Sequence, residues 1–252
     1  MPHPKPHLLL IHGYPLDHGL WEPNRDALER VAEVMAPDLL AFGPTEAVPE
    51  VLRMEDLAEQ LVQQLDAEGI ERTVVCGLSM GGYVALAILE RWPERVAGII
   101  LCNTRSTADT AEGKRGRADS AEEVLAKGSA VIARAMVPKL LSAHSRSTAP
   151  ALAKTVEAII ARQQPAAIAA ASRGMGLRPD RTPVLRTAGK PTLIITGEHD
   201  ALMPLPTSEA MAAAAPGSTL VVLPEAGHLS NMEDPEGFNK AVTDFLRTLP
   251  GS

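Results

Sequence analysis

The chain has 252 residues, of which 45% are hydrophobic and 22% are charged. This length suits one domain, or one domain with a large insertion, and the apolar content excludes an intrinsically disordered chain. A net charge of −7 argues against nucleic acid as a partner. No apolar run approaches the length of a membrane span, so we expect no membrane partner.

Short, continuous apolar runs of the kind found in buried strands alternate with helical patterns along the chain. Before the first run there are too few apolar residues for a signal peptide, and a cytoplasmic location is therefore expected. The alternation predicts a parallel sheet with helices on both faces. The predicted strands are Leu8–Ile11, Val31–Pro37, Thr73–Cys76, Val96–Cys102, Thr192–Thr196 and Thr219–Leu223, and the helices between and after them are Glu22–Arg30, Met54–Glu68, Ser79–Arg91 and Pro235–Leu249.

The regular alternation stops between about Thr104 and Lys190, where no strand-like run occurs. This stretch is too long for a simple crossover between strands, and it is cationic, because residues 105–190 hold 15 Lys and Arg against 7 Asp and Glu. We predict a helical cap at residues 105–189, inserted into a core domain of residues 1–104 and 190–252. The helical patterns of the cap are Ala121–Lys127, Ser129–Leu141, Ala149–Ala161 and Ala166–Gly174.

The sequence Gly77-Leu78-Ser79-Met80-Gly81-Gly82 lies between a predicted strand and a predicted helix. This context is typical of a nucleophile elbow, a tight turn that lifts a serine hydroxyl above the sheet edge at a helix N-terminus. The alternative is a serine in a purely structural turn. We predict that Ser79 is the nucleophile.

A serine hydroxyl needs a base to take its proton. His228 directly follows the last predicted strand, at the edge of the sheet where active sites of open α/β folds gather. His199 competes for the role, but it lies beside Asp200 at the end of the preceding strand. We predict His228 as the base.

Asp200 closes the segment Gly197-Glu198-His199-Asp200 after a strand, where a carboxylate can orient the base. The alternatives are a helix N-cap role for Asp200 and the use of Glu198 as the acid. With Asp200, the chain order is Ser, Asp, His, the order of α/β-hydrolases.

An oxyanion hole requires two backbone N–H groups. Met80, directly after the predicted nucleophile, supplies one, and Tyr14 in the loop His12-Gly13-Tyr14-Pro15 supplies the other. We expect the side chain of His12 to brace this loop rather than to take part in the chemistry.

The sequence resembles the α/β-hydrolase family over essentially its whole length. The blocks HGYP, GLSMGG, GEHD and PEAGHLSNMEDPE carry the resemblance, and the run GLSMGG…WPERVAGIILCNT, with Leu16-Asp17-His18 and Trp21, is most similar to the esterase and 3-oxoadipate enol-lactonase branch. The resemblance implies hydrolysis of a small carboxylic ester or lactone through an acyl-enzyme on Ser79, with no cofactor and no metal.

Family members usually begin with a β-hairpin, which this chain lacks. We therefore expect six parallel strands in the order 4-3-5-6-7-8 of the family's numbering. Ser79 argues against haloalkane dehalogenases and epoxide hydrolases, which carry Asp there, and Leu229 argues against hydroxynitrile lyases, which carry Lys after the histidine. A perhydrolase and a slow-turnover ligand receptor remain alternatives.

The cap also bears on the substrate. Met136, Met175 and Met203 are candidate lining residues, because Met adapts to irregular apolar surfaces. The positive charge of the cap predicts attraction of carboxylate-bearing lactones. Alternatively, these charges are simply solvated, or they dock the cap onto the acidic core.

Overall fold

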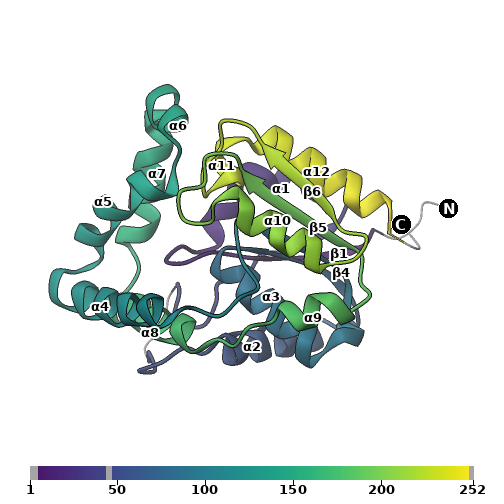
Figure 1. The fold of residues 1–252 in the computed structure, drawn as a ribbon, viewed down its shortest axis with the longest axis horizontal. Helices are drawn as coiled ribbons and strands as arrows, with labels where there is room; N and C mark the ends of the chain where they lie inside the picture. Colours follow the sequence, from purple (N-terminus) through teal and green to yellow (C-terminus); the bar gives the residue numbers. More distant parts are fainter. Residues whose placement is uncertain (1–4, 44–46, 250–252) are drawn as a thin grey trace.

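The computed structural model describes residues 5–43 and 47–249, and these contain one six-stranded sheet (Figure 1). The strand order is β2-β1-β3-β4-β5-β6 and every neighbouring pair is parallel, which confirms the predicted sheet and its order. The strands are β1 (His7–Ile11), β2 (Glu33–Met35), β3 (Thr73–Leu78), β4 (Val96–Cys102), β5 (Thr192–Gly197) and β6 (Thr219–Leu223).

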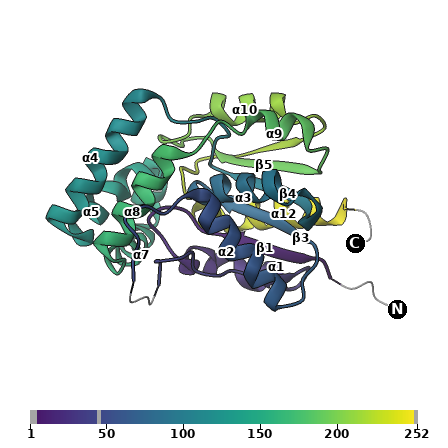
Figure 2. The ribbon, with the colours of Figure 1, turned by 90° about the horizontal axis from the view of Figure 1, so that it is seen from below.

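Consecutive residues of each strand face opposite sides of the sheet, so one apolar strand contributes to two cores. In β1, Leu9 and Ile11 belong to one core, while Leu8 and Leu10 belong to the other. The helices over the first face are α2 (Met54–Ala67), α3 (Met80–Arg91), α9 (Thr182–Thr187) and α10 (Leu205–Ala214), and those over the second are α1 (Glu22–Glu29) and α12 (Pro235–Arg247). Figure 2 shows α2 and α3 side by side along the sheet.

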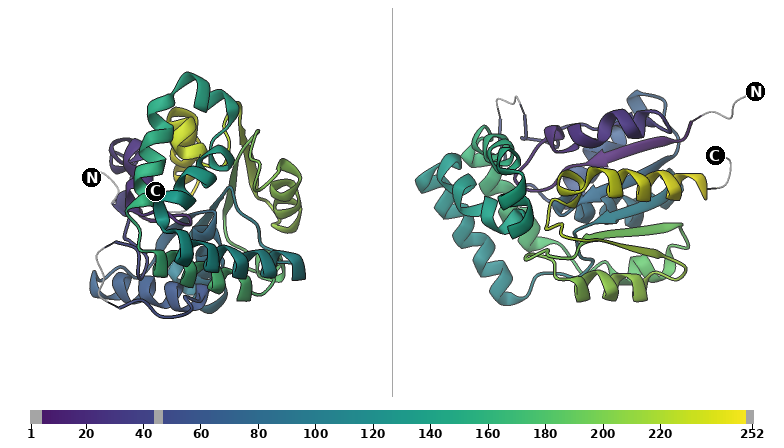
Figure 3. Two further views of the ribbon diagram at one scale, coloured as in Figure 1. Left: turned by 90° about the vertical axis from the view of Figure 1, so that its left-hand side faces the viewer. Right: turned by 90° about the horizontal axis from the view of Figure 1, so that it is seen from above.

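Six helices fill the chain between β4 and β5. Four of them, α4, α5, α7 and α8, form a group at one end of the sheet (Figures 2 and 3), whereas α9 packs against α3 and α10. Within this stretch α4 pairs with α8, and α5 pairs with α7. The six are α4 (Ala111–Lys127), α5 (Ser129–Leu140), α6 (Ala143–Thr148), α7 (Pro150–Ala161), α8 (Pro165–Leu177) and α9.

The helix α4 begins ten residues earlier than the pattern from Ala121 predicts. Its first turns carry glycines and charges rather than a periodic apolar face, so their sequence gives no helical signal. The Thr110 side chain accepts a hydrogen bond from the Gly113 N–H and caps the helix there. The six-residue helices α6 and α9 were not predicted, because each is too short to show a 3.6-residue period.

Candidate active site

Ser79 lies in the sharp turn between β3 and α3, and its backbone has φ 55°. A positive φ is uncommon for a residue with a side chain, and such strain persists only where the surroundings hold it. The Ser79 N–H donates to the carbonyl of Cys102, and the Ser79 carbonyl accepts from the Thr104 hydroxyl at 2.7 Å and from the Gly82 N–H. The end of β4 with the residues after it, together with the first turn of α3, therefore holds the turn in place.

Two glycines allow this turn to form. A methyl group at Gly77 would overlap the backbone of Gly81, and one at Gly81 would overlap the carbonyl of Ile11. The strand β3, the helix α3 and the end of β1 consequently approach more closely than any side chain would permit.

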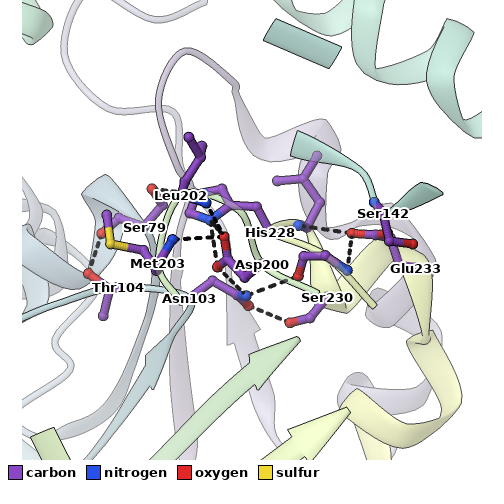
Figure 4. Close-up of polar contacts among 12 residues, drawn as sticks. Ser79, Asn103, Thr104, Ser142, Asp200, Leu202, Met203, His228, Ser230 and Glu233 are labelled. Carbon is purple, nitrogen blue, oxygen red and sulfur yellow. Dashed lines mark hydrogen bonds and ion pairs between the residues drawn. The ribbon is translucent and has the colours of Figure 1, made fainter. Parts of the chain in front are cut away.

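His228 follows β6 and is buried, with its ring between Ser79 and Asp200 (Figure 4). Its Nε2 lies 2.9 Å from the Ser79 Oγ, and its Nδ1 lies 2.8 and 3.0 Å from the two carboxylate oxygens of Asp200. The carboxylate accepts the Nδ1 proton, which leaves the Nε2 lone pair free to accept from the serine hydroxyl. The three residues come from different loops at the carboxyl edge of the sheet.

Asp200 is held by more than the histidine. Its Oδ1 accepts hydrogen bonds from the N–H groups of Leu202 and Met203, and its Oδ2 accepts one from the Asn103 Nδ2 at 2.9 Å. Burial on its own raises the pKa of Asp200, but the charge of His228 and these hydrogen bonds outweigh burial and hold the pKa below its usual range. The carboxylate stays ionised, as an acceptor for a histidine must.

The alternative base and the alternative acid considered from the sequence, His199 and Glu198, form no hydrogen bond with Ser79 or His228 among the described contacts. His199 is half exposed, with its Nε2 3.5 Å from the Glu225 carboxylate, and Glu198 is exposed. Asp200 does bond to the N–H groups that follow it, as an N-cap would, but the same carboxylate also contacts His228.

The sequence analysis did not predict two residues that hold the loops around His228 and Asp200. Asn103 follows the carboxyl end of β4, and besides Asp200 its amide donates to the Gly227 carbonyl while its Oδ1 accepts from the Ser230 hydroxyl. Glu233 accepts from the N–H groups of Gly227 and Leu229. The position of Asn103 at the strand edge was the available signal, whereas nothing in the sequence pairs Glu233 with the histidine loop.

The loop after β1 lies against the Ser79 turn, since a methyl group at Gly13 would lie 3.3 Å from the Ser79 Cβ. Neither Tyr14 nor Met80 donates its backbone N–H to a protein acceptor among the described residues. His12 is fully buried, and its Nδ1 donates to the Gly13 carbonyl while its Nε2 accepts from the Leu39 N–H. Burial lowers the pKa of His12 and outweighs the opposing effect of the Gly13 bond. The side chain thus links two loops in its neutral form.

A cavity of about 350 Å³ opens onto Ser79 and His228. Met136, Met175 and Met203 line it, together with Leu202 and the side chain of Tyr14. The remaining lining residues are Arg105, Asp109, Gly113, Gly116, Arg117, Ser120 and Lys139. A separate hollow of about 480 Å³ lies between β6 and α12. It shares no lining residue with the cavity at Ser79.

One group of side chains has metal-ligand spacing among the described residues, namely Asp17, His18 and Asp38. The Asp17 carboxylate is already bonded to Arg162 and Gln163, and His18 Nδ1 lies 2.8 Å from Asp38. None of the three lines the cavity at Ser79. Asp17 thus links the loop after β1 to the residues after α7, and Asp38 links the same loop to the segment after β2.

Comparisons with known proteins agree with the observed fold. A family model described as alpha/beta hydrolase fold matches residues 6–235. The chain is 27% identical to 3-oxoadipate enol-lactonase 1 of Acinetobacter baylyi over 98% of this chain and 91% of that protein. It is 28% identical to a pimeloyl-[acyl-carrier protein] methyl ester esterase of Aromatoleum aromaticum, over 96% of this chain and 99% of that protein.

Solved structures give the same result. A thermophilic esterase from Thermogutta terrifontis, in a malate-bound form, superposes with a TM-score of 0.94 at 39% identity, over 97% of this chain and 90% of that one. The enol-lactonase from Burkholderia xenovorans superposes with a TM-score of 0.89 at 27% identity, over 96% and 92% of the two chains. In the part of the chain that the structure describes, no helix is both long and apolar enough to cross a membrane.

Proposed function

The chain belongs to the alpha/beta hydrolase family, and we propose that it cleaves small carboxylic esters or lactones through an acyl-enzyme on Ser79. The observation that carries the proposal is the position of one imidazole, with its Nε2 2.9 Å from the Ser79 Oγ and its Nδ1 2.8 Å from Asp200. This is the arrangement that a base for a serine nucleophile needs.

In the proposed reaction, His228 takes the proton of Ser79 as the hydroxyl oxygen attacks the carbonyl carbon of the ester. The C=O bond becomes C–O⁻, and the backbone N–H groups of Tyr14 and Met80 stabilise that charge. His228 then gives its proton to the leaving alkoxide, and the alcohol departs. A water molecule, deprotonated by His228, then attacks the acyl-serine, and His228 returns the proton to the Ser79 Oγ as the C–O bond to serine breaks and the acid is released.

The substrate class rests on the relatives. Both an enol-lactonase and a methyl ester esterase match nearly the whole chain, which supports carboxylic esters and lactones alike. We further propose that residues 105–189 act as a cap over Ser79, with Met136 and Met175 from the cap and Met203 from the core as contacts for the acyl group. Because no step needs a metal or an organic cofactor, we expect activity in the presence of chelators.

Trapping the intermediate tests the proposal. The protein is mixed with p-nitrophenyl acetate, quenched in acid and digested, and the peptide that contains Ser79 is expected to carry an acetyl group. Ser79→Ala should show no such adduct, while Ser147→Ala, which alters an exposed serine on α6, should behave as the wild type. Unchanged turnover in Ser79→Ala would refute the proposal.

Two alternatives are separated by the same preparation. A ligand receptor that retains the three residues would release about one product per protein and then stall, whereas an enzyme turns over many times. A perhydrolase would form peracetic acid when hydrogen peroxide competes with water for the acyl-enzyme, and that product can be measured directly. Hydrolysis of a simple lactone beside an open ester decides between the two substrate forms.

A further inference from the structure

One buried carboxylate in the cavity wall contacts three guanidinium groups. Asp109 Oδ1 lies 2.8 Å from Arg178 and 3.0 Å from Arg105, and its Oδ2 lies 3.3 Å from Arg117. The Asp109 side chain is 1% exposed. Burial on its own raises its pKa, but the hydrogen bond from Arg178 and the charges of the three arginines outweigh burial and lower it. The cluster therefore holds three positive charges and one negative charge.

Arg178 supplies one positive charge, which matches the single negative charge of Asp109. Its side chain is 2% exposed, donates to the carbonyls of Met175 and Thr107, and stacks at 3.9 Å over the ring of Tyr83. Such an arginine is a structural partner for the buried carboxylate. Arg105 and Arg117 then remain as excess positive charge at the cavity wall.

Two other cap arginines contact carboxylates of the core. Arg162, directly after α7, forms two hydrogen bonds with Asp17 of the β1 loop, and Arg181 contacts Glu55 and Glu90 of the core. These pairs agree with the expectation that cap charges dock onto the acidic core. Arg105 and Arg117 have no such core acid, since the only carboxylate they contact among the described residues is Asp109.

Both arginines line the same cavity as Ser79 and His228, and Lys139 of α5 lines it too. Among the described lining residues Asp109 is the only acid. The Arg105 Nε is buried and has no hydrogen-bond partner among the described groups, which leaves a donor without an acceptor. Excess charge and an unmet donor at one cavity wall are the features of a site for an anionic ligand.

The Tyr14 hydroxyl adds a polar group to the same cavity. Ser120, Ser172 and Arg117 oppose the rise that burial causes in the pKa of Tyr14, so these groups lie near its hydroxyl. That oxygen nevertheless forms no hydrogen bond of ordinary distance and angle among the described residues. Only 8% of the tyrosine is exposed. Tyr14 itself lines the cavity.

We propose that the cavity selects small esters or lactones that carry a free carboxylate besides the bond to be cleaved, with Arg105 and Arg117 as the residues that bind it. This inference rests on the proposed serine hydrolase function. The cleaved bond stays at Ser79, and the added carboxylate accepts hydrogen bonds from the two guanidinium groups.

Two substrate pairs of matched size test the preference. Monomethyl glutarate and methyl valerate differ in the acyl part by a carboxylate in place of a methyl group, and 4-acetoxybutyrate and butyl acetate differ in the same way in the alcohol part. Acid release is measured in a pH-stat after subtraction of the spontaneous rate. In at least one pair we expect kcat/KM to favour the charged ester by about tenfold, the effect of one hydrogen bond to a charged group.

Variants locate the selectivity. Arg117→Gln should reduce the ratio of charged to neutral kcat/KM about tenfold, and Arg105→Gln should reduce it similarly. Arg117→Lys, which keeps the charge, should retain most of it. Arg115→Gln is the matched control, since Arg115 lies on the same helix, is exposed and does not line the cavity. It removes the same charge from the cap, so its ratio should be unchanged.

The outcomes separate the two proposals. Hydrolysis of p-nitrophenyl acetate through Ser79, with no preference for either charged ester, overturns the carboxylate site and leaves the serine hydrolase standing. A preference that Arg115→Gln lowers as much as Arg117→Gln does, or that disappears equally in all variants at high salt, indicates general attraction by the cap and also overturns the site. Loss of the ratio in Arg117→Gln and in Arg105→Gln, with Arg115→Gln unchanged, supports it.

Discussion

The amide Nδ2 of Asn103 lies 2.9 Å from the Oδ2 of Asp200, and it is the one side-chain donor besides His228 that contacts this carboxylate among the described residues. Asn103 stands after β4, Asp200 after β5, and the Gly227 carbonyl that the same amide reaches belongs to the loop after β6. One side chain therefore joins the three loops that position the histidine.

We predict that Asn103→Ala lowers kcat/KM about tenfold, because Asp200 loses a charge-assisted hydrogen bond and orients His228 less well. Asn103→Asp should be more harmful in acid, since a second carboxylate raises the pKa of Asp200. The pH–rate profiles of both variants measure this. Wild-type profiles in both would show that Asn103 has no positioning role.

For Ser79→Ala we expect ester hydrolysis to fall by about 10⁶-fold with little change in the melting temperature, because the hydroxyl makes no hydrogen bond that the fold needs apart from the one to His228. Residue 79 should keep its φ near 55° in the variant, because the surrounding hydrogen bonds to its backbone remain. A small decrease in the melting temperature is therefore compatible with the prediction. Rates and thermal unfolding are measured on the same sample. If Ser79→Ala loses its fold as well as its activity, Ser79→Cys replaces it as the test. Ser79→Cys should keep the turn and the fold but lose ester hydrolysis.

Acid should destabilise the fold in two stages. His12 is neutral when buried and its pKa lies below the usual 6.5, so the unfolded chain binds a proton first and stability falls as the pH drops below about 6.5. Asp200 and Asp109 have lowered pKa values, so their stabilisation is present above the usual carboxyl pKa and is lost only as the pH falls through the lowered values. The free energy of unfolding, measured with a denaturant at pH values from about 7.5 to about 4, reports the first stage.

His12→Asn should remove the His12 part of that first stage, at the cost of lower stability near neutral pH from the lost bond to Leu39. His144→Gln, which changes a half-exposed histidine of α6, is the control and should keep the wild-type slope. An unchanged slope in His12→Asn would contradict the assignment.

Glu233 should matter for both stability and catalysis. Its carboxylate accepts from Gly227 and Leu229 on either side of His228, and from the Ser142 N–H after α5. We predict that Glu233→Ala lowers the free energy of unfolding by about 1–3 kcal/mol, because backbone donors lose their acceptor, and that it lowers kcat as the histidine loop loosens. Glu233→Gln, which keeps an acceptor oxygen, should lie between the two. Equal stability of all three proteins would disprove this link.

The sequence by itself determined the sheet and the order along the chain of Ser79, Asp200 and His228, the residues proposed to react. Apolar runs such as Thr73–Cys76 can only be buried strands, and the Gly77-x-Ser79-x-Gly81 turn admits no side chains at its glycines, as the overlap with the Gly81 and Ile11 backbones explains. Parallel strands place their carboxyl ends at one edge, so residues after different strands were expected to meet there. These signals are local, and local sequence carries them.

Only the tertiary structure decided which polar groups support the site and which charges face the cavity. Asn103 contacts Asp200, 97 residues away, and Glu233 contacts Ser142, 91 residues away, by hydrogen bonds that depend on loop paths rather than on any sequence pattern. The arginines of residues 105–189 look alike in the sequence, yet Arg162 pairs with Asp17 while Arg117 lines the cavity of Ser79. The direction of a side chain follows from how helices pack, and packing is settled by contacts between residues distant in the chain.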